Sequence, residues 1–217
     1  RSISCFRLLA SLPYMSITFS VLVIVLIQFV CLGLGFLIPN YAQLVNSQDA
    51  FLAGSLLLPG CLAGAVLSPV SGRLLDRFGA EKPILSGNLC VIVSLCCFSI
   101  FAGSLTAVPV VVFYLFFAAG QGFSVGNSMT NGLSHLPPEK NPDGNAVINT
   151  LQQLAGAVGT AVVSTIVASA QTAMPDQLAE ATRQGSTHAF WLLFALSIVM
   201  ILCSAGAFLT ARRQSAS

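Results

Sequence analysis

The stretch ITFSVLVIVLIQFVCLGLGFLI, Ile17 to Ile38, decides the fold, because it contains no charged side chain along its whole length. A helix of about 20 apolar residues crosses the roughly 30 Å hydrocarbon core of a bilayer. Five further runs of similar length and character follow, at residues 50–71, 83–103, 107–129, 145–170 and 189–211. Strands of a membrane barrel would instead be about ten residues of alternating character. We therefore expect an all-α membrane protein, a bundle of six transmembrane helices.

The composition of the chain indicates the same environment. Of its 217 residues, 55% are hydrophobic and 7% are charged, whereas about a quarter of the residues in a soluble domain are charged. The formal net charge of +2 provides no basic surface for nucleic acid. The lipid bilayer is thus the expected surroundings, and a nucleic-acid partner is not expected.

Most of the seven cysteines lie inside the apolar runs. These are Cys31, Cys61, Cys90, Cys96, Cys97 and Cys203. Neither C-x-x-C pairs nor interspersed histidines give them the spacing of a metal site. We expect buried thiols in packed helices, with no disulfide framework, no metal centre and no cofactor.

The basic residues predict the orientation of the chain, because they are concentrated in cytoplasmic loops of membrane proteins. If the amino terminus is cytoplasmic, Arg183 is the only basic residue expected on the outer side. The cytoplasmic set is then Arg1, Arg7, Arg73, Arg77, Lys82, Lys140, Arg212 and Arg213. We expect a lead-in at 1–16 and a tail at 212–217, both cytoplasmic, in a plasma membrane. The chain opens with Arg1 and not with Met, so its start is expected to be a cut end.

The stretch SGRLLDRFGAEKP, Ser71 to Pro83, contains five of the sixteen charged residues. Its positive charge alone would keep this connection in the cytoplasm. Its glycines allow tight turns after the second helix and before the third, and a carboxylate in such a turn can accept hydrogen bonds from the amides of a neighbouring helix N-terminus. We predict a gating loop made by Gly72, Arg73, Asp76, Arg77, Gly79 and Lys82.

Three segments resemble a known family. The residues Gly72, Asp76, Arg77, Gly79 and Lys82 match much of G-x-x-x-D-R-x-G-R-K-x, the loop between the second and third helices of each half in the major facilitator superfamily. LLLPG at 56–60, with Pro69, and GNAVINTLQQLAGAVGTAVVSTI at 144–166 resemble the carboxy-terminal half of its fourteen-span drug/proton antiporter branch. Ala80 and Glu81 depart from the family pattern, which often has basic residues there.

The resemblance implies one half of a secondary transporter that exports drugs or other amphipathic small molecules by alternating access, coupled to protons. Its partner would be a missing amino-terminal half. No ionisable residue lies well inside an expected span, and proton carriers in membranes are normally such residues. The proton site is therefore expected in the missing half.

Polar residues inside the spans are candidates for a substrate path, because they must face protein or water. Asn149 and Gln152 share one face of the fifth helix, and Gln121 and Asn127 lie in the fourth. Gln28 has only apolar sequence neighbours, and the resemblance implies that its helix lines the central cavity. The alternative for each amide is a hydrogen bond that joins two helices.

Two other functions are considered. The chain could be a self-contained six-span protein, either a homodimeric carrier or a non-transporting partner. GFSVG, with Ser124 at its centre, also fits the G-x-S-x-G pattern of serine hydrolases, which need a base within hydrogen-bond reach. The histidines at 135 and 188 are expected at the two boundaries of the membrane, too far from Ser124 to serve an intramembrane protease.

Overall fold

The computed structural model describes residues 15–134 and 136–215, and the bundle is built from helices throughout this part. The α-helices are α2 (Met15–Leu44), α3 (Ala50–Ser55), α4 (Leu58–Phe78), α5 (Glu81–Phe101), α6 (Ala107–Ser134), α7 (Asn141–Ala173) and α8 (Leu178–Ser215). Short 3-10 turns, η2 (Ala102–Ser104), η3 (Pro138–Lys140) and η4 (Pro175–Gln177), lie in the connections. Most of the expected lead-in, His135 and the last two residues of the tail lie outside the described residues.

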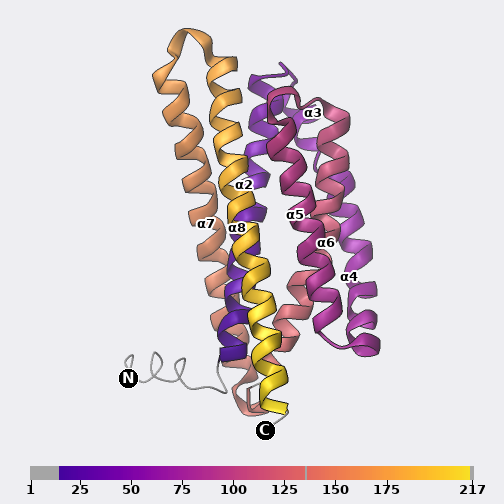
Figure 1. Ribbon diagram of the computed structural model, residues 1–217. Coiled ribbons are helices and arrows are strands. Elements are labelled where there is room, and N and C mark those ends of the chain that lie inside the picture. The colour runs from indigo at the N-terminus through magenta and orange to yellow at the C-terminus, as the bar shows by residue number, and fades with distance from the viewer. Residues whose placement is uncertain (1–14, 135, 216–217) are drawn as a thin grey trace.

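Six helical segments are long and apolar enough to cross a bilayer, counting α3 and α4 together. They run side by side (Figure 1), with the α4–α5 and α6–α7 connections at the lower end and the other three at the upper end. The helices extend past the apolar runs; α2, for example, continues six residues beyond Ile38. Helical backbone satisfies its own hydrogen bonds, so it can leave the hydrocarbon region and continue into water.

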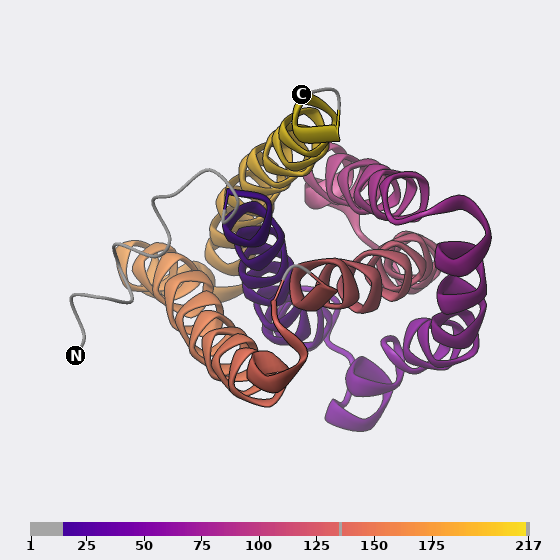
Figure 2. The same ribbon diagram turned by 90° about the horizontal axis from the view of Figure 1, so that it is seen from below.

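Two helices, α2 and α6, form the centre of the bundle. Helix α2 packs mainly against α6, α7 and α8, and α6 packs mainly against α2, α4 and α5. Seen along the bundle (Figure 2), α5 and α8 cover one side of the central pair, while α7 and α4 flank it. Helices α4 and α7 do not pack against each other. The central pair is thus covered on one side only.

The second span is broken at Leu56 and Leu57, which divide it into α3 and α4. Asp49 begins α3 as its N-cap and accepts a hydrogen bond from the Leu52 amide at 2.9 Å. Pro59 occupies the first turn of α4, where its missing N–H leaves no hydrogen bond unmade. The break therefore follows from local sequence.

The α4–α5 connection is much shorter than the loop expected from the sequence. Helix α4 runs to Phe78 and α5 begins at Glu81, so Gly72 lies within a helix and does not end one. The charged residues extend α4 into water instead of forming a loop. Only Gly79 turns the chain, with a positive φ of 75° that glycine adopts without strain.

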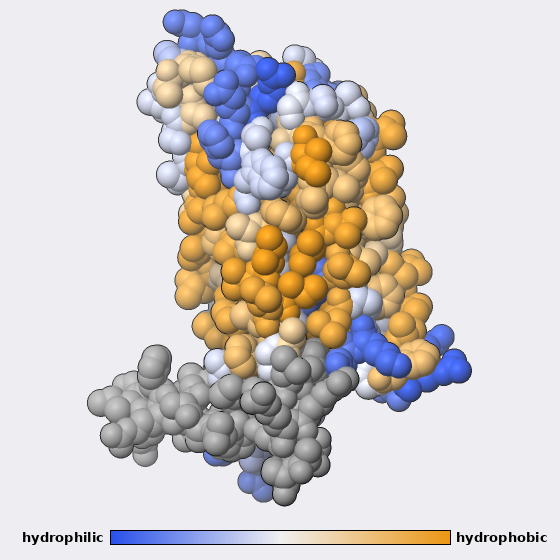
Figure 3. All heavy atoms as spheres, viewed as in Figure 1, coloured by the Kyte–Doolittle hydropathy of each residue, from blue (hydrophilic) through white to orange (hydrophobic). Residues whose placement is uncertain are grey.

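The core is apolar in the upper half of the bundle. Phe98 of α5 and Phe190 of α8 stack there with ring centroids 5.1 Å apart, and neither is exposed. The face drawn in Figure 3 is apolar across its middle, with polar side chains at the upper end and over the α4–α5 connection. This distribution is that of a chain surrounded by lipid.

Candidate transport face

The uncovered side of the central pair, between α4 and α7, is here called the transport face. It is defined by Gln28 of α2, Cys61 of α4, Gln121 of α6, and Asn149 and Gln152 of α7. Helices α5 and α8 lie on the opposite side of the pair (Figure 2). Because one face of each central helix has no helix over it, polar residues on this face are accessible to a partner or to solvent.

Gln28 lies on the transport face near the middle of α2. Its neighbours on the helix fix its direction: Cys31 contacts Gln121 of α6, and the backbone of Phe29 touches Gly159 of α7. Gln28 lies between these two contacts and is half-buried. Its amide has no hydrogen-bond partner among the described residues. An unpaired amide is costly in hydrocarbon, so this position calls for water, a substrate or another protein surface.

Gln121 is tied to the neighbouring central helix. Its Nε2 donates to the Cys31 thiol at 3.1 Å, a weak acceptor. The amide oxygen of Gln121 has no partner in the described chain, and the residue is only half-buried. Gln121 therefore joins two helices through its amide nitrogen, and its amide oxygen remains free as an acceptor at the transport face.

The two amides of α7 lie nearer the lower end. Asn149 is exposed, and its side-chain bonds go only to Asn145, one turn earlier in the same helix. Gln152 is half-buried without a partner in the described chain. Helices α2 and α7 run parallel and touch where Gly159 meets Phe29, so Gln152 lies below the level of Gln28. The three amides thus lie at successive heights along the bundle, from Asn149 near the lower end to Gln28 near the middle of α2.

Asn127 occupies a different place from the one expected. It is 2% exposed and donates from Nδ2 to Ser71 Oγ of α4 and to the Phe123 carbonyl, both at 2.8 Å. Its amide joins α4 to α6 and is not presented at the transport face. A buried amide in lipid needs such partners, and the sequence could not show that α4 supplies one.

The structure adds Cys61 and Tyr114 to the face, which the sequence did not indicate. The Cys61 thiol is exposed and lies 4.0 Å from the Tyr114 hydroxyl of α6. Tyr114 can reach this position because its ring packs over Gly60, where a Cβ would overlap it. A small residue in α4 thus lets the buried Tyr114 ring lie beside the exposed Cys61 thiol.

A buried polar cluster lies where α6 meets α5 and α8. Ser124 Oγ donates to Asn88 Oδ1 at 2.6 Å, and Asn88 Nδ2 donates to Ser204 of α8. All three side chains are at most 1% exposed. The Ser124 hydroxyl of GFSVG is thus engaged with an amide in a closed core, and His188 is an exposed residue of the upper end.

The predicted gating residues surround the α4–α5 connection at the lower end. Phe78 is 49% exposed, and the charges of Arg77 and Lys82 each lie 5.4 Å from its ring centre. Such cation–π contacts hold side chains in a fixed direction. Asp76 is exposed and has no hydrogen-bond or ion-pair partner in the described part of the chain. Its carboxylate is therefore available to a group from outside this bundle.

Asp, Glu, Lys, Arg and His residues are confined to the ends of the described helices. Each of them lies in a connection or in the first or last turns of a helix, with His188, three turns into α8, as the innermost. The transport face itself contributes amides, a thiol and a phenol at membrane depth. Such a face offers hydrogen-bonding groups and apolar surface and carries no net charge.

Comparison with known proteins agrees with this architecture. Residues 1–160 match the family model described as Major Facilitator Superfamily. The chain is 36% identical to the lincomycin resistance protein LmrB of Bacillus subtilis over 213 residues. This match covers 94% of the chain and 44% of LmrB. Identity to LmrB of Listeria monocytogenes is 33% over 192 residues, 84% of the chain and 41% of the relative.

A more distant relative is the multidrug resistance protein B homolog of Mycobacterium tuberculosis. It is 27% identical over 133 residues, which are 60% of the chain and 25% of that protein. The chain spans less than half the length of each of these relatives. It belongs to the major facilitator superfamily and is an integral membrane protein.

Proposed function

We propose that the chain is one half of a transporter that exports amphipathic drugs, with both termini in the cytoplasm of a plasma membrane. The single observation that supports this most is the transport face, where unpartnered amides lie at membrane depth on the uncovered side of α2 and α6. Two six-helix halves enclose a site near the bilayer midplane and rock around it. The length of the relatives leaves room for a second half.

The substrate proposed first is lincomycin or a molecule of similar amphipathic chemistry. Two relatives are named lincomycin resistance proteins, and the face offers neutral donors and acceptors next to apolar side chains. An uncharged, half-polar surface discriminates weakly between amphipathic molecules. Proton coupling would be supplied by the second half, since the described spans have no ionisable residue near their middle.

The α4–α5 connection is proposed to latch the two halves at the lower end. Asp76 has an exposed carboxylate without a partner in the described chain, and a helix N-terminus on the other half would supply amide donors. Arg77 and Lys82 then serve to hold Phe78 and to keep this end in the cytoplasm.

Drug susceptibility tests the proposal. The full-length transporter would be expressed in a lincomycin-sensitive bacterium, and the lowest growth-inhibiting concentration compared with that of the empty vector. We expect the transporter to raise this concentration, and a proton uncoupler to restore drug accumulation. A protein that is well expressed in the membrane yet changes neither lincomycin accumulation nor that of other amphipathic drugs would refute drug export.

A further inference from the structure

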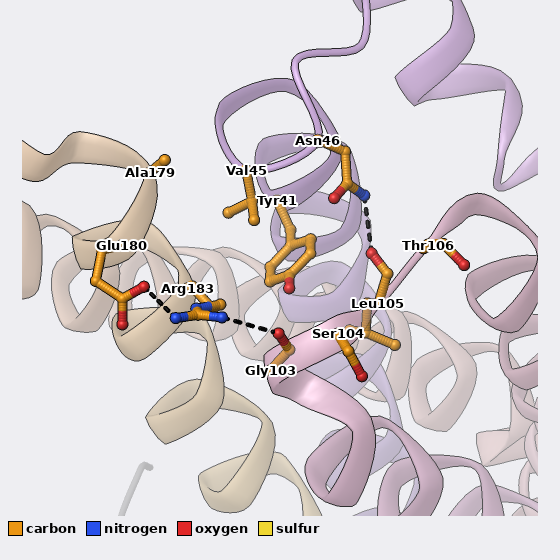
Figure 4. Close-up of a pocket in the computed structure, with 10 residues that line it drawn as sticks. All are labelled: Tyr41, Val45, Asn46, Gly103, Ser104, Leu105, Thr106, Ala179, Glu180 and Arg183. Atoms are coloured by element: carbon orange, nitrogen blue, oxygen red, sulfur yellow. Dashed lines mark hydrogen bonds and ion pairs between the residues drawn. The ribbon is translucent and has the colours of Figure 1, made fainter.

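The upper end of the bundle contains a cavity of about 330 Å³, unrelated to the transport face (Figure 4). Its frame is the α5–α6 connection, which side chains from α2, from the turn after α2 and from α8 hold in place. Tyr41 Oη donates to the Ala102 carbonyl at 2.9 Å, and Asn46 Nδ2 donates to that of Leu105 at 2.8 Å. Arg183 Nη1 of α8 donates to the Gly103 carbonyl at 3.2 Å. The cavity wall is therefore fixed in place before any ligand enters.

Several hydrogen-bond donors of the lining are not used within the protein. Arg183 donates only to Gly103 and Glu180, so three of its five N–H groups have no partner in the described chain. The hydroxyls of Ser104 and Thr106 also line the cavity and make no hydrogen bond to any described residue. The guanidinium is a donor for a phosphate or carboxylate group, whereas the two hydroxyls point away from it, with Leu105 between Arg183 and Thr106 (Figure 4).

The same cavity offers an acceptor and an apolar wall. Glu180 pairs with Arg183 and accepts from Gln184 at 3.0 Å, yet a carboxylate accepts about four hydrogen bonds. Val45, Leu105 and the ring of Tyr41 supply apolar surface beside these charges (Figure 4). A ligand with an acid group, an amine and an apolar part would satisfy every one of these groups.

We propose that this outer cavity binds a zwitterionic head group, with its phosphate or carboxylate on Arg183 and its ammonium on Glu180. The cavity volume lies at the small end of the range for ligand pockets, which suits a head group. Tyr41 and Gly103 of its lining lie near the ends of two spanning segments, Thr18–Leu44 and Glu81–Ser104, and lipid head groups flank the hydrocarbon core at such ends. The proposal does not depend on drug export.

The test uses the full-length transporter in detergent and native mass spectrometry. Three probes are titrated: dihexanoyl phosphatidylethanolamine, which has both charges, dihexanoyl phosphatidylglycerol, which lacks the amine, and free phosphoethanolamine. We expect the ethanolamine lipid to bind more tightly than the glycerol lipid. Arg183→Gln should weaken both lipids, the ethanolamine lipid by roughly tenfold or more, and Glu180→Gln should weaken only the ethanolamine lipid.

Two further variants are controls. Thr106→Val breaks no hydrogen bond of the described chain, and its hydroxyl points away from Arg183 (Figure 4), so it should change neither the unfolding temperature nor the binding of either lipid. Lys140→Gln removes an exposed cation at the opposite end and should change nothing. Binding of the free head group as well as the lipid supports a soluble zwitterion as ligand, and binding of the lipid alone supports a membrane lipid. Equal binding of the two lipids, or no effect of Arg183→Gln and Glu180→Gln, overturns the proposal.

Discussion

Gly87 of α5 and Gly120 of α6 cross in backbone contact: a Cβ on Gly120 would lie 2.5 Å from the Gly87 carbonyl oxygen, and one on Gly87 would lie 2.7 Å from the Gly120 oxygen. Both residues are buried. Close approach of this kind lets two helices pack in lipid, where no hydrophobic effect drives them together. The crossing also brings Asn88 within hydrogen-bond reach of Ser124.

The first prediction is that Gly120→Ala destabilises the bundle. The added methyl group meets backbone atoms of α5, which cannot rotate away as a side chain can, and overpacking of this kind costs about 1–3 kcal/mol. The unfolding temperature of the full-length transporter in detergent measures this loss. Gly126→Ala in the same helix is the control, because a Cβ there meets nothing within 4 Å. Equal unfolding temperatures for the two variants would contradict the crossing.

The second prediction concerns the buried cluster around Asn88. Asn88→Ala leaves the hydroxyl of Ser124 without its acceptor and removes the bond to Ser204, so we expect a loss of about 1–3 kcal/mol. Asn149→Ala is the matched control, because that amide is exposed and bonds only within its own helix. Asn88→Ala should lower the unfolding temperature, and Asn149→Ala should leave it unchanged. The opposite order would show that the cluster does not hold α5, α6 and α8 together.

The third prediction tests the proposed latch. Asp76→Asn removes an exposed charge that has no partner in the described chain, so the unfolding temperature should not change. Drug export should fall severalfold, because a charge-assisted hydrogen bond between the halves would be lost. Glu139→Gln removes another exposed carboxylate from the same end and should have no effect on export. Full export by the Asp76 variant at equal membrane levels would exclude the latch.

The fold followed from the sequence more directly than the connections did. Long apolar runs predict membrane helices because lipid demands internally bonded backbone, and the structure has six helical segments of spanning length. The secondary structure of the charged stretch after Ser71 was harder to predict, because charged residues are compatible both with a loop and with a helix that continues into water. Hydropathy does not distinguish these two cases, and the structure shows the helix.

The transport face was only partly predictable. Gln28, Asn149 and Gln152 stand out in the sequence as amides within apolar runs, and none of the three is buried in the bundle. Asn127 is also an amide within an apolar run, yet its side chain donates a hydrogen bond to Ser71. Which amides find partners depends on which helices touch, and this is a property of the packing. The positions of Cys61 and Tyr114 beside each other could not be predicted, because cysteine and tyrosine do not interrupt an apolar run as an amide does.

The fourth prediction states the central claim: the transport face touches the exported molecule. Gln152 is half-buried on that face, whereas its neighbour Gln153 points elsewhere and is exposed. Losing one neutral hydrogen bond to a substrate should weaken transport by about two- to tenfold. Neither substitution by Ala breaks a hydrogen bond within the described chain, so both variants should fold normally.

The most direct measurement is therefore lincomycin uptake into inside-out proteoliposomes that contain the purified full-length transporter and carry an imposed proton gradient. The unmodified protein should accumulate the drug, Gln153→Ala should match it, and Gln152→Ala should show the two- to tenfold loss. Uptake that is equal for all three proteins would contradict the role of this face, and the absence of uptake for lincomycin and other amphipathic drugs would contradict export itself.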